Sequence, residues 1–344
     1  MYHSHLLINT GDNPDRVDWQ RTRAWLRNLY RVHQRLCMAF PDKDKSLAGK
    51  SEAEHFAEYC KPFTPFQIHK DDPFQQADED CASPDVHQPR SPYTGFLYRI
   101  DYPVIGSLRR PVIVVQSANR PDWDHAFGLN PGSGAHRNGD TPPKPPKGNA
   151  DFLLAAPPQV REIDIDADTE KLVLKSGEFA HEAKPGDQLW FILRANVVET
   201  RTGNDGKKGR HRLRIDEEIM NACKDAKTDE ERLEANQKIE QARRQVHLDW
   251  LRKKLGDAAE LVVKTINEPK PEREHPFIET GWAHASRGDY DKGGKTPKED
   301  MRWWAVTYTG KLTVQDPAKL RSLIHSGIGP AKAFGFGLLS VARA

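Results

Sequence analysis

Residues 189–200 carry the strongest strand signal in this chain of 344 residues. The segment reads LWFILRANVVET and is rich in the branched and aromatic side chains that favour extended backbone. A turn sequence, Asn-Asp-Gly, follows at 204–206, and residues 207–214 are then expected to return as the second arm of a hairpin. An antiparallel hairpin near the middle of the chain is therefore expected.

Strands and helices alternate in both halves of the chain. In the first half we expect a strand at 2–9, a single helix from about 18 to 40, strands at 95–103 and 111–117, and weaker strands at 160–165 and 171–175. In the second half the strand at 189–200 is followed by a long charged helix, which begins with a Thr228–Glu231 capping box and ends near Gly256. We then expect a strand at 303–314, a helix at 317–325 and a last strand at 338–342.

This order resembles β-α-β-β-α-β in each half, although the second helix of the first half is unclear. The predicted fold class is therefore α+β, with two tandem ferredoxin-like (RRM-like) domains at 1–184 and 185–344. Polar, proline-rich stretches at about 43–92 and 130–150 are interpreted as insertions into the first domain.

Basic residues gather in three segments, although the net charge is only +2. Five arginines and no carboxylate occur between Trp19 and Pro41, and four of them repeat every four residues along the predicted helix, at positions 23, 27, 31 and 35. The other two basic segments are 201–214 and the part of the chain after Asp316, which has no acidic side chain. Three such segments can converge on one polyanion, but they are equally compatible with solvated surfaces.

His33 is the candidate for acid–base chemistry. By helical angle it falls among the apolar positions Leu26, Leu29 and Phe40, and a histidine in such a place is usually a core residue with satisfied hydrogen bonds. Its neighbours favour a second interpretation, because Tyr30 precedes it by three residues beside the arginine repeat. Cleavage of RNA without a metal needs one group to take the 2′-hydroxyl proton and arginines to stabilise charge on phosphorus.

The glycine-rich segment GIGPAKAFGFG at 327–337 invites a comparison with nucleotide-binding loops. Such loops follow a strand and open a helix, whereas this one is expected to follow a helix and precede a strand. A nucleotide cofactor is therefore not expected. Two roles stay open for the loop: a close approach to an RNA backbone, with Lys332 as a point charge, or a tight turn.

No feature of the sequence requires a membrane, a disulfide framework or a metal. It has no apolar run of about 20 residues and no secretory signal, and its four cysteines are widely spaced, so a cytoplasmic location with reduced thiols is expected. A zinc site is the alternative for the histidines and cysteines of the first insertion, but their spacing fits no closely paired ligand pattern. These residues are His55, Cys60, His69, Cys81 and His87.

Four blocks of sequence, in family order, resemble the CasE family, whose members are the pre-crRNA endoribonucleases of the type I-E Cascade complex. The most specific is the last, SGIGPAKAFGFGLLSVA, and the opening MYHSHLLIN and VVQSANRP at 114–121 are weaker matches. The four blocks are LYRVHQRLCMAFPD at 29–42, FILRANVVET at 191–200, WLRKKLG at 250–256 and SGIGPAKAFGFGLLSVA at 326–342.

This resemblance implies binding of CRISPR repeat stem-loops and one cut that leaves a 2′,3′-cyclic phosphate and a 5′-hydroxyl, without cofactor or metal. It implies that the protein stays on the mature crRNA with other Cascade subunits. The family's catalytic histidine and tyrosine fall on His33 and Tyr30. The expected RNA-binding residues are Arg27, Arg31, Lys207, Lys208, Arg210, Arg212, Gly327, Gly329, Lys332 and Gly335. The alternative is a non-catalytic subunit that caps the crRNA hairpin.

Overall fold

The computed structural model describes residues 1–10, 19–40, 96–105, 108–117, 120–127, 153–162, 171–176, 179–202, 208–213, 228–266, 273–286 and 300–344. These residues form two compact units, neither of which is one continuous piece of chain. Unit 1 comprises 1–166, 283–302 and 333–335, and unit 2 comprises 167–282, 303–332 and 336–344. Both predicted insertions lie largely outside the described residues, and the boundary expected after residue 184 stays a prediction.

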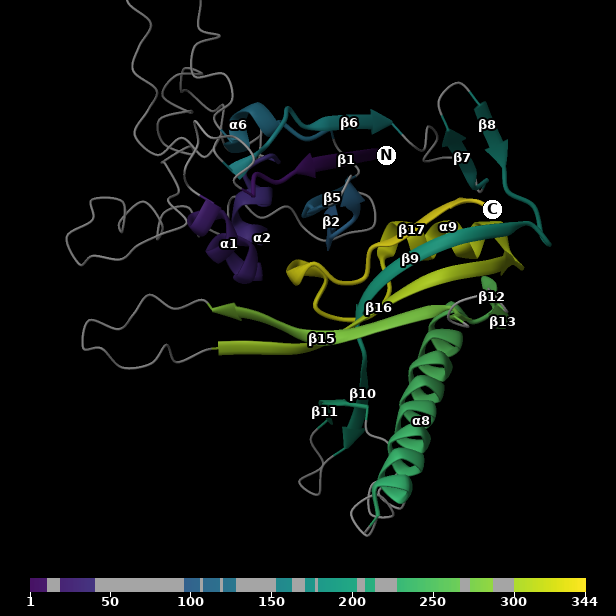
Figure 1. Cartoon of the computed structure of the whole chain (residues 1–344). Helices are drawn as coiled ribbons and strands as arrows, with labels where there is room; N and C mark the ends of the chain where they lie inside the picture. Colours follow the sequence, from purple (N-terminus) through teal and green to yellow (C-terminus); the bar gives the residue numbers. More distant parts are fainter. Residues whose placement is uncertain are drawn as a thin grey trace, which may run out of the picture. The chain divides into compact units, whose positions relative to one another are not determined.

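Unit 1 contains a four-stranded antiparallel sheet in the order β2-β5-β1-β6 (Figure 1). Its strands are β1 (Tyr2–Leu7), β2 (Phe96–Asp101), β5 (Val112–Ser117) and β6 (Gln159–Glu162). The short strands β3 (Val104–Ile105) and β4 (Leu108–Arg109) pair with each other. Its helices are α1 (Trp19–Arg27), α2 (Leu29–Cys37) and the short α6 (Trp123–Phe127).

One face of this sheet is the core of unit 1. Cross-strand partners stack there in rows, with Leu6 and Ile100 on either side of Ile113 and Ser4 and Tyr98 on either side of Val115. All six side chains are buried. Because alternate residues of a strand face the same side, Phe96 shares this face and lies under α2.

The single helix expected over 18–40 is wrong, because the structure divides it at Asn28. This residue has an extended backbone, with φ −101° and ψ 94°, and its side chain accepts a hydrogen bond of 3.1 Å from the Tyr30 N–H. Asparagine is among the most favourable N-cap residues, so the chain ends one helix and begins another here. The four-residue arginine repeat is consequently split between α1 and α2 and does not form one stripe.

Unit 2 is built on a second sheet in the order β12-β16-β9-β17, with β15 added beside β16. These strands are β9 (Gln188–Asn196), β12 (Ala259–Val262), β15 (Phe277–Ser286), β16 (Asp300–Val314) and β17 (Leu339–Arg343). Three two-stranded pairs accompany it: β7 (Val173–Ser176) with β8 (Phe179–Glu182), β10 (Val198–Thr202) with β11 (Lys208–Arg212), and β13 (Lys264–Ile266) with β14 (Arg273–His275).

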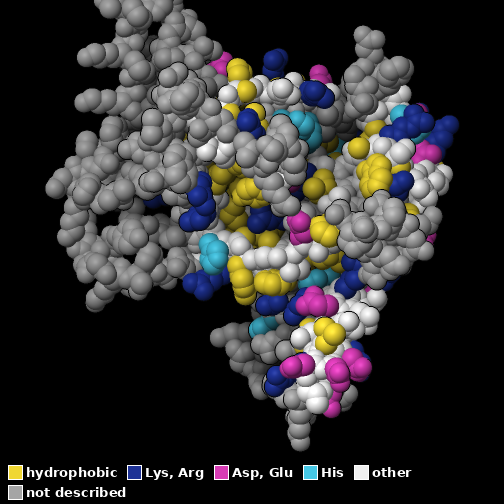
Figure 2. All heavy atoms as spheres, viewed as in Figure 1, with side chains coloured by type: hydrophobic (Ala, Val, Ile, Leu, Met, Phe, Trp, Pro, Cys, Tyr) yellow, Lys and Arg dark blue, Asp and Glu magenta, His cyan; other side chains and the backbone are white. Residues whose placement is uncertain are grey.

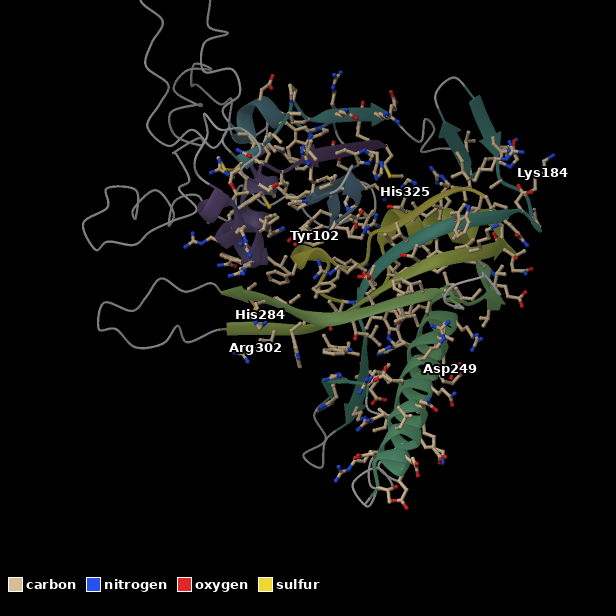
Figure 3. The ribbon with its side chains drawn as sticks, viewed as in Figure 1. Tyr102, Lys184, Asp249, His284, Arg302 and His325 are labelled. Atoms are coloured by element: carbon tan, nitrogen blue, oxygen red, sulfur yellow. The ribbon has the colours of Figure 1, made fainter. Side chains whose placement is uncertain are left out.

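The helices of unit 2 are α8 (Asp229–Leu255) and α9 (Pro317–Ser326). The predicted capping box of α8 is present, since Thr228 Oγ1 accepts from the Glu231 N–H and Glu231 Oε2 accepts from the Thr228 N–H, both at 3.1 Å. Only the last three turns of α8 contain buried residues. The outer part of α8 carries mixed acidic and basic side chains (Figure 2). Within its last turns, Asp249 (labelled in Figure 3) accepts hydrogen bonds of 2.8 Å from Gln245 and Arg252.

The mixed α and β content expected from the sequence is confirmed. The strand at 189–200 is interrupted at Val197, which ends β9 before the β10–β11 hairpin begins. No helix among the described residues is long and apolar enough to cross a bilayer.

Candidate functional site

His33 lies in the second turn of α2, inside unit 1, and is 6% exposed. Its imidazole stacks on Phe96 with ring centres 5.6 Å apart and planes 27° apart, and the ring of Phe334 lies 6.3 Å away. The Cys37 Sγ is 3.6 Å from His33 Nε2, one helical turn further along α2. These contacts fix the plane of the imidazole within the site.

Aromatic packing holds this imidazole against the sheet. Phe96 stacks in turn on Phe40, at 5.0 Å, and Phe40 meets the edge of Trp123. The hydroxyl of the fully buried Tyr98 donates a 3.0 Å hydrogen bond to the Leu29 carbonyl, which ties the start of α2 to β2. A hydrogen bond in such a place is worth about 0.5–1.5 kcal/mol and fixes the register of the helix on the sheet.

The C-terminal glycine-rich segment completes the surroundings of His33. Residues 333–335 belong to unit 1, although the residues on either side of them belong to unit 2. Gly335 has φ +76°, and a Cβ added there would lie 3.0 Å from Tyr98 Cε2. Glycine is therefore favoured here both by the backbone conformation and by the close approach to the tyrosine ring.

Tyr30 and the arginines of the predicted repeat differ in their exposure and in their contacts. Tyr30 is half-buried, at the first turn of α2. Arg27 is exposed at the end of α1, and Arg31 is half-buried in α2. Arg35 is buried and donates a 2.7 Å hydrogen bond to the Ala126 carbonyl, so it anchors α6 to α2. Of the predicted repeat, only Arg31 shares the helix of His33 and is accessible.

The predicted basic hairpin is present in unit 2 as β10 and β11. Lys208 and Arg210 lie in β11, whereas Lys207 lies outside the described residues. Arg212 is exposed, but its guanidinium lies over the Trp304 ring, 3.7 Å from its centre. Partial desolvation of this guanidinium, followed by the charge of Arg243, lowers the pKa of Arg212.

The glycine-rich loop of unit 2 is a tightly packed connection between α9 and β17, in the predicted order helix, loop, strand. Gly327 closes α9 with φ +71°, and Gly329, with φ +81°, packs against the Trp250 ring. Lys332 donates a hydrogen bond to the Ser326 carbonyl, so its ammonium group is engaged within the loop. The structure supports the tight-turn interpretation of these residues, and their contact with RNA stays a prediction.

No group of three or more potential metal ligands occurs among the residues that the structure describes. The histidines and cysteines considered for zinc in the first insertion lie outside them.

Comparison with known proteins places the chain in a family. The family described as CRISPR associated protein matches residues 79–343. The chain belongs to this family. The resemblance to CasE proteins found in the sequence is thereby confirmed, and one of the similar proteins is itself named CasE.

One relative is the CRISPR system Cascade subunit CasE of Escherichia coli K12, 30% identical over 175 residues, which are 49% of this chain and 65% of that protein. Another is the CRISPR-associated endoribonuclease Cse3 of Thermus thermophilus, 41% identical over 51 residues, which are 15% of this chain and 24% of that protein. The aligned segments thus span less than two thirds of either relative. The crystal structure of Cas6e from E. coli K-12 is 19% identical, with a TM-score of 0.43 over the whole of both chains.

Several residues of these sites were not predicted from the sequence. Cys37 lies four residues after His33, and this spacing alone would have indicated contact on one helix face. Phe96 and Phe334 are distant in sequence, and no local pattern connects them to His33. Two exposed residues of unit 1 also lie outside the three predicted segments, His284 on β15 and Arg302 on the paired strand β16 (Figure 3).

Proposed function

We propose that this CRISPR-associated protein is a metal-independent endoribonuclease that cleaves CRISPR repeat RNA, with His33 as its catalytic residue. The observation that carries the proposal is the fixed imidazole of His33, on the same helix as Tyr30 and Arg31, in a member of this family. The Thermus relative is named as an endoribonuclease, which supports the same reaction class.

In the proposed reaction the 2′-oxygen of one nucleotide attacks the adjacent phosphorus. The 2′-hydroxyl loses its proton, the new O2′–P bond forms, and the P–O5′ bond breaks as the 5′-oxygen gains a proton. His33 is assigned to proton transfer in this step because an imidazole changes charge near neutral pH. Arg31 is assigned to the charge that develops on the phosphoryl oxygens, and Tyr30 to positioning the substrate.

The burial of His33 sets a condition on this mechanism. At 6% exposure its nitrogens are reached by an RNA backbone only after a neighbouring side chain turns away. The Phe334 ring, which is tilted at 52° to the imidazole and not stacked on it, is our candidate for that movement. Catalytic hydrogen bonds often form only in the substrate complex, so the unbound geometry is compatible with this role.

The substrate and partners proposed are the repeat stem-loop, the mature crRNA and the other subunits of a Cascade complex. We also propose that both units are ferredoxin-like. In each, the four main strands lie in the order second, third, first, fourth, with helices after the first and the third, as a β-α-β-β-α-β unit requires. The β10–β11 hairpin with Lys208, Arg210 and Arg212 is assigned to the RNA stem.

A second function is favoured by one observation. The contacts of His33 with Phe96, Phe334 and Cys37 are also those of a core histidine, which would make the protein an RNA-binding subunit without cleavage activity. Both functions predict binding of the repeat stem-loop, but only the enzyme produces a cyclic phosphate.

The test is incubation of the protein with repeat RNA from a neighbouring CRISPR array, in EDTA, with analysis of the product ends. Cleavage that leaves a 2′,3′-cyclic phosphate, and that stops when the nucleotide before the cut carries a 2′-deoxy group, is expected. Tight binding with intact RNA would establish the alternative. Cleavage of the deoxy substrate would contradict internal attack by the 2′-oxygen.

A further inference from the structure

A cluster of two tryptophans and one arginine lies in unit 2, at the end of the β10–β11 hairpin. We name it the Arg212–tryptophan cluster, after Arg212, Trp282 and Trp304. The two indole rings meet edge to face, 5.2 Å apart, and the Arg212 guanidinium is 3.7 Å from the centre of the Trp304 ring and 5.5 Å from that of Trp282. Three different elements, β11, β15 and β16, supply these side chains.

The exposure of the two rings is unequal. Trp282 is 55% exposed, whereas Trp304 is half-buried. A single exposed apolar side chain is ordinary and by itself indicates nothing. Here, however, the exposed indole meets the second indole edge to face and lies 5.5 Å from the Arg212 guanidinium, which itself stacks closely on Trp304. It is therefore an ordered aromatic face turned to solvent.

The electrostatic surroundings of this face are positive. The charge of Arg243 contributes to the lowered pKa of Arg212, and His247 of α8 is close to both arginines. Arg243 forms an ion pair with Glu240, which compensates it in part. An aromatic face among cations is complementary to a nucleotide, whose base has a π-face and whose phosphate is an anion.

We propose that the Arg212–tryptophan cluster binds an unpaired base of the RNA by stacking on Trp282, with Arg212 or Arg243 at the adjoining phosphate. This inference rests on the proposed function, since it assigns a new subsite to the same RNA ligand. The bases inside a stem already stack on their neighbours, so the face of Trp282 is available only to a base outside the duplex. The occupant is therefore a nucleotide that flanks or loops out of the stem.

The proposal separates Arg212 from Arg210, which the sequence had assigned to one common role. Arg212 presents the flat face of its guanidinium to Trp304, a contact that lysine does not reproduce. The hairpin then contributes two kinds of contact: Arg210 is assigned to the phosphates of the stem, and Arg212 to the aromatic platform and its adjoining phosphate.

The test compares RNA affinities of the full chain and of Trp282→Ala by fluorescence anisotropy over a series of salt concentrations. Stacking on an aromatic side chain is worth about 1–3 kcal/mol per base, so the affinity is expected to fall about 5- to 150-fold. The slope of log affinity against log salt should not change, because no phosphate contact is removed. Trp282→Phe should retain part of the affinity.

The matched control is Trp190→Ala on β9. Trp190 is 39% exposed and has Lys311 4.5 Å from its ring centre, so it too is an aromatic face beside a cation, but it is not part of the Arg212–tryptophan cluster. Its loss should leave RNA affinity within about twofold of the wild type. A uniform loss in both variants would show a general effect of removing surface tryptophans and would overturn the proposal.

A second measurement identifies the base. Repeat RNAs with one abasic nucleotide are scanned over the unpaired positions, which keeps every phosphate in place. At one position the abasic RNA should bind the wild type and Trp282→Ala equally. Equal affinity of both proteins for the unmodified RNA would overturn the subsite while leaving the proposed function intact. Failure of the wild type to bind any repeat RNA would overturn both.

Discussion

Replacement of His33 by alanine tests the assignment of the catalytic residue, provided that its effect on rate is separated from its effect on stability. Positioned proton transfer contributes about 10²–10⁴ to a rate, or about 3–5 kcal/mol of barrier. His33 is 6% exposed and in contact with two aromatic rings, so its truncation should also cost about 1–3 kcal/mol of folding free energy.

These two losses have very different consequences for activity. The free energy of unfolding of a domain of ordinary stability is about 5–15 kcal/mol. Even at the lower end of this range, about 2 kcal/mol remains after the largest expected loss. At about 1.4 kcal/mol per factor of ten, more than nine-tenths of the protein stays folded. Unfolding therefore accounts for less than a twofold loss of rate, and a hundredfold loss must come from the chemistry.

The assay is single-turnover cleavage of repeat RNA at saturating protein, in EDTA at 25 °C, together with RNA affinity and urea unfolding. Phe40→Leu is the matched control, because Phe40 is buried and stacks on Phe96, one layer away from the imidazole. It should lose comparable stability and keep its rate within about tenfold. Cleavage by folded His33→Ala at close to the wild-type rate would refute the assignment of His33.

Three further outcomes are expected. Gly335→Ala should lose about 1–3 kcal/mol more stability in urea unfolding than Gly186→Ala. Both glycines have positive φ, but only at Gly335 does the new Cβ meet a buried tyrosine ring, at 3.0 Å. Equal losses would contradict this packing. Neutralising Arg210 and Arg212 together should flatten the salt slope of RNA binding by up to about 2, with little change in the rate at saturation, whereas identical slopes would remove the hairpin from the RNA surface. Burial and two nearby arginines lower the pKa of His247 to about 4. The unfolded chain therefore binds the proton first, and stability should fall by up to about 3 kcal/mol as pH drops from 6.5 to 4. The melting temperature of His247→Leu should depend less on pH over this range, and an unchanged dependence would contradict the assignment.

Elements with strong local signals could be predicted from the sequence. The capping box at Thr228 and Glu231 determines where α8 begins, because both of its hydrogen bonds lie within four residues. The turn sequence at 204–206 predicted the β10–β11 pairing for the same reason. The helix at 18–40 was misjudged because Asn28 occurs within a continuous apolar periodicity, and its capping bond to Tyr30 interrupts the helix without disturbing that pattern.

The surroundings of the candidate catalytic residue could be predicted only in part. Helical angle correctly placed His33 among apolar residues, and the structure buries it. Its contacts with Phe96 and Phe334 come from tertiary packing between segments that share no periodicity. Arg35 shows the same limit, because its spacing grouped it with surface arginines while its guanidinium is taken by the Ala126 carbonyl.

The assignment of residues 333–335 to unit 1 has a consequence for how the protein is made. Phe334 and Gly335, which contact His33 and Tyr98, are translated about 300 residues after the helix that they complete. Contacts of such high sequence separation form late, because the loop that they close must be ordered first. In a ribosome-bound chain that has emerged only through residue 166, the imidazole of His33 still lacks its contact with the Phe334 ring. The candidate catalytic site thus matures only after most of unit 2 has been synthesised, so a truncated translation product would carry the histidine but not its finished environment.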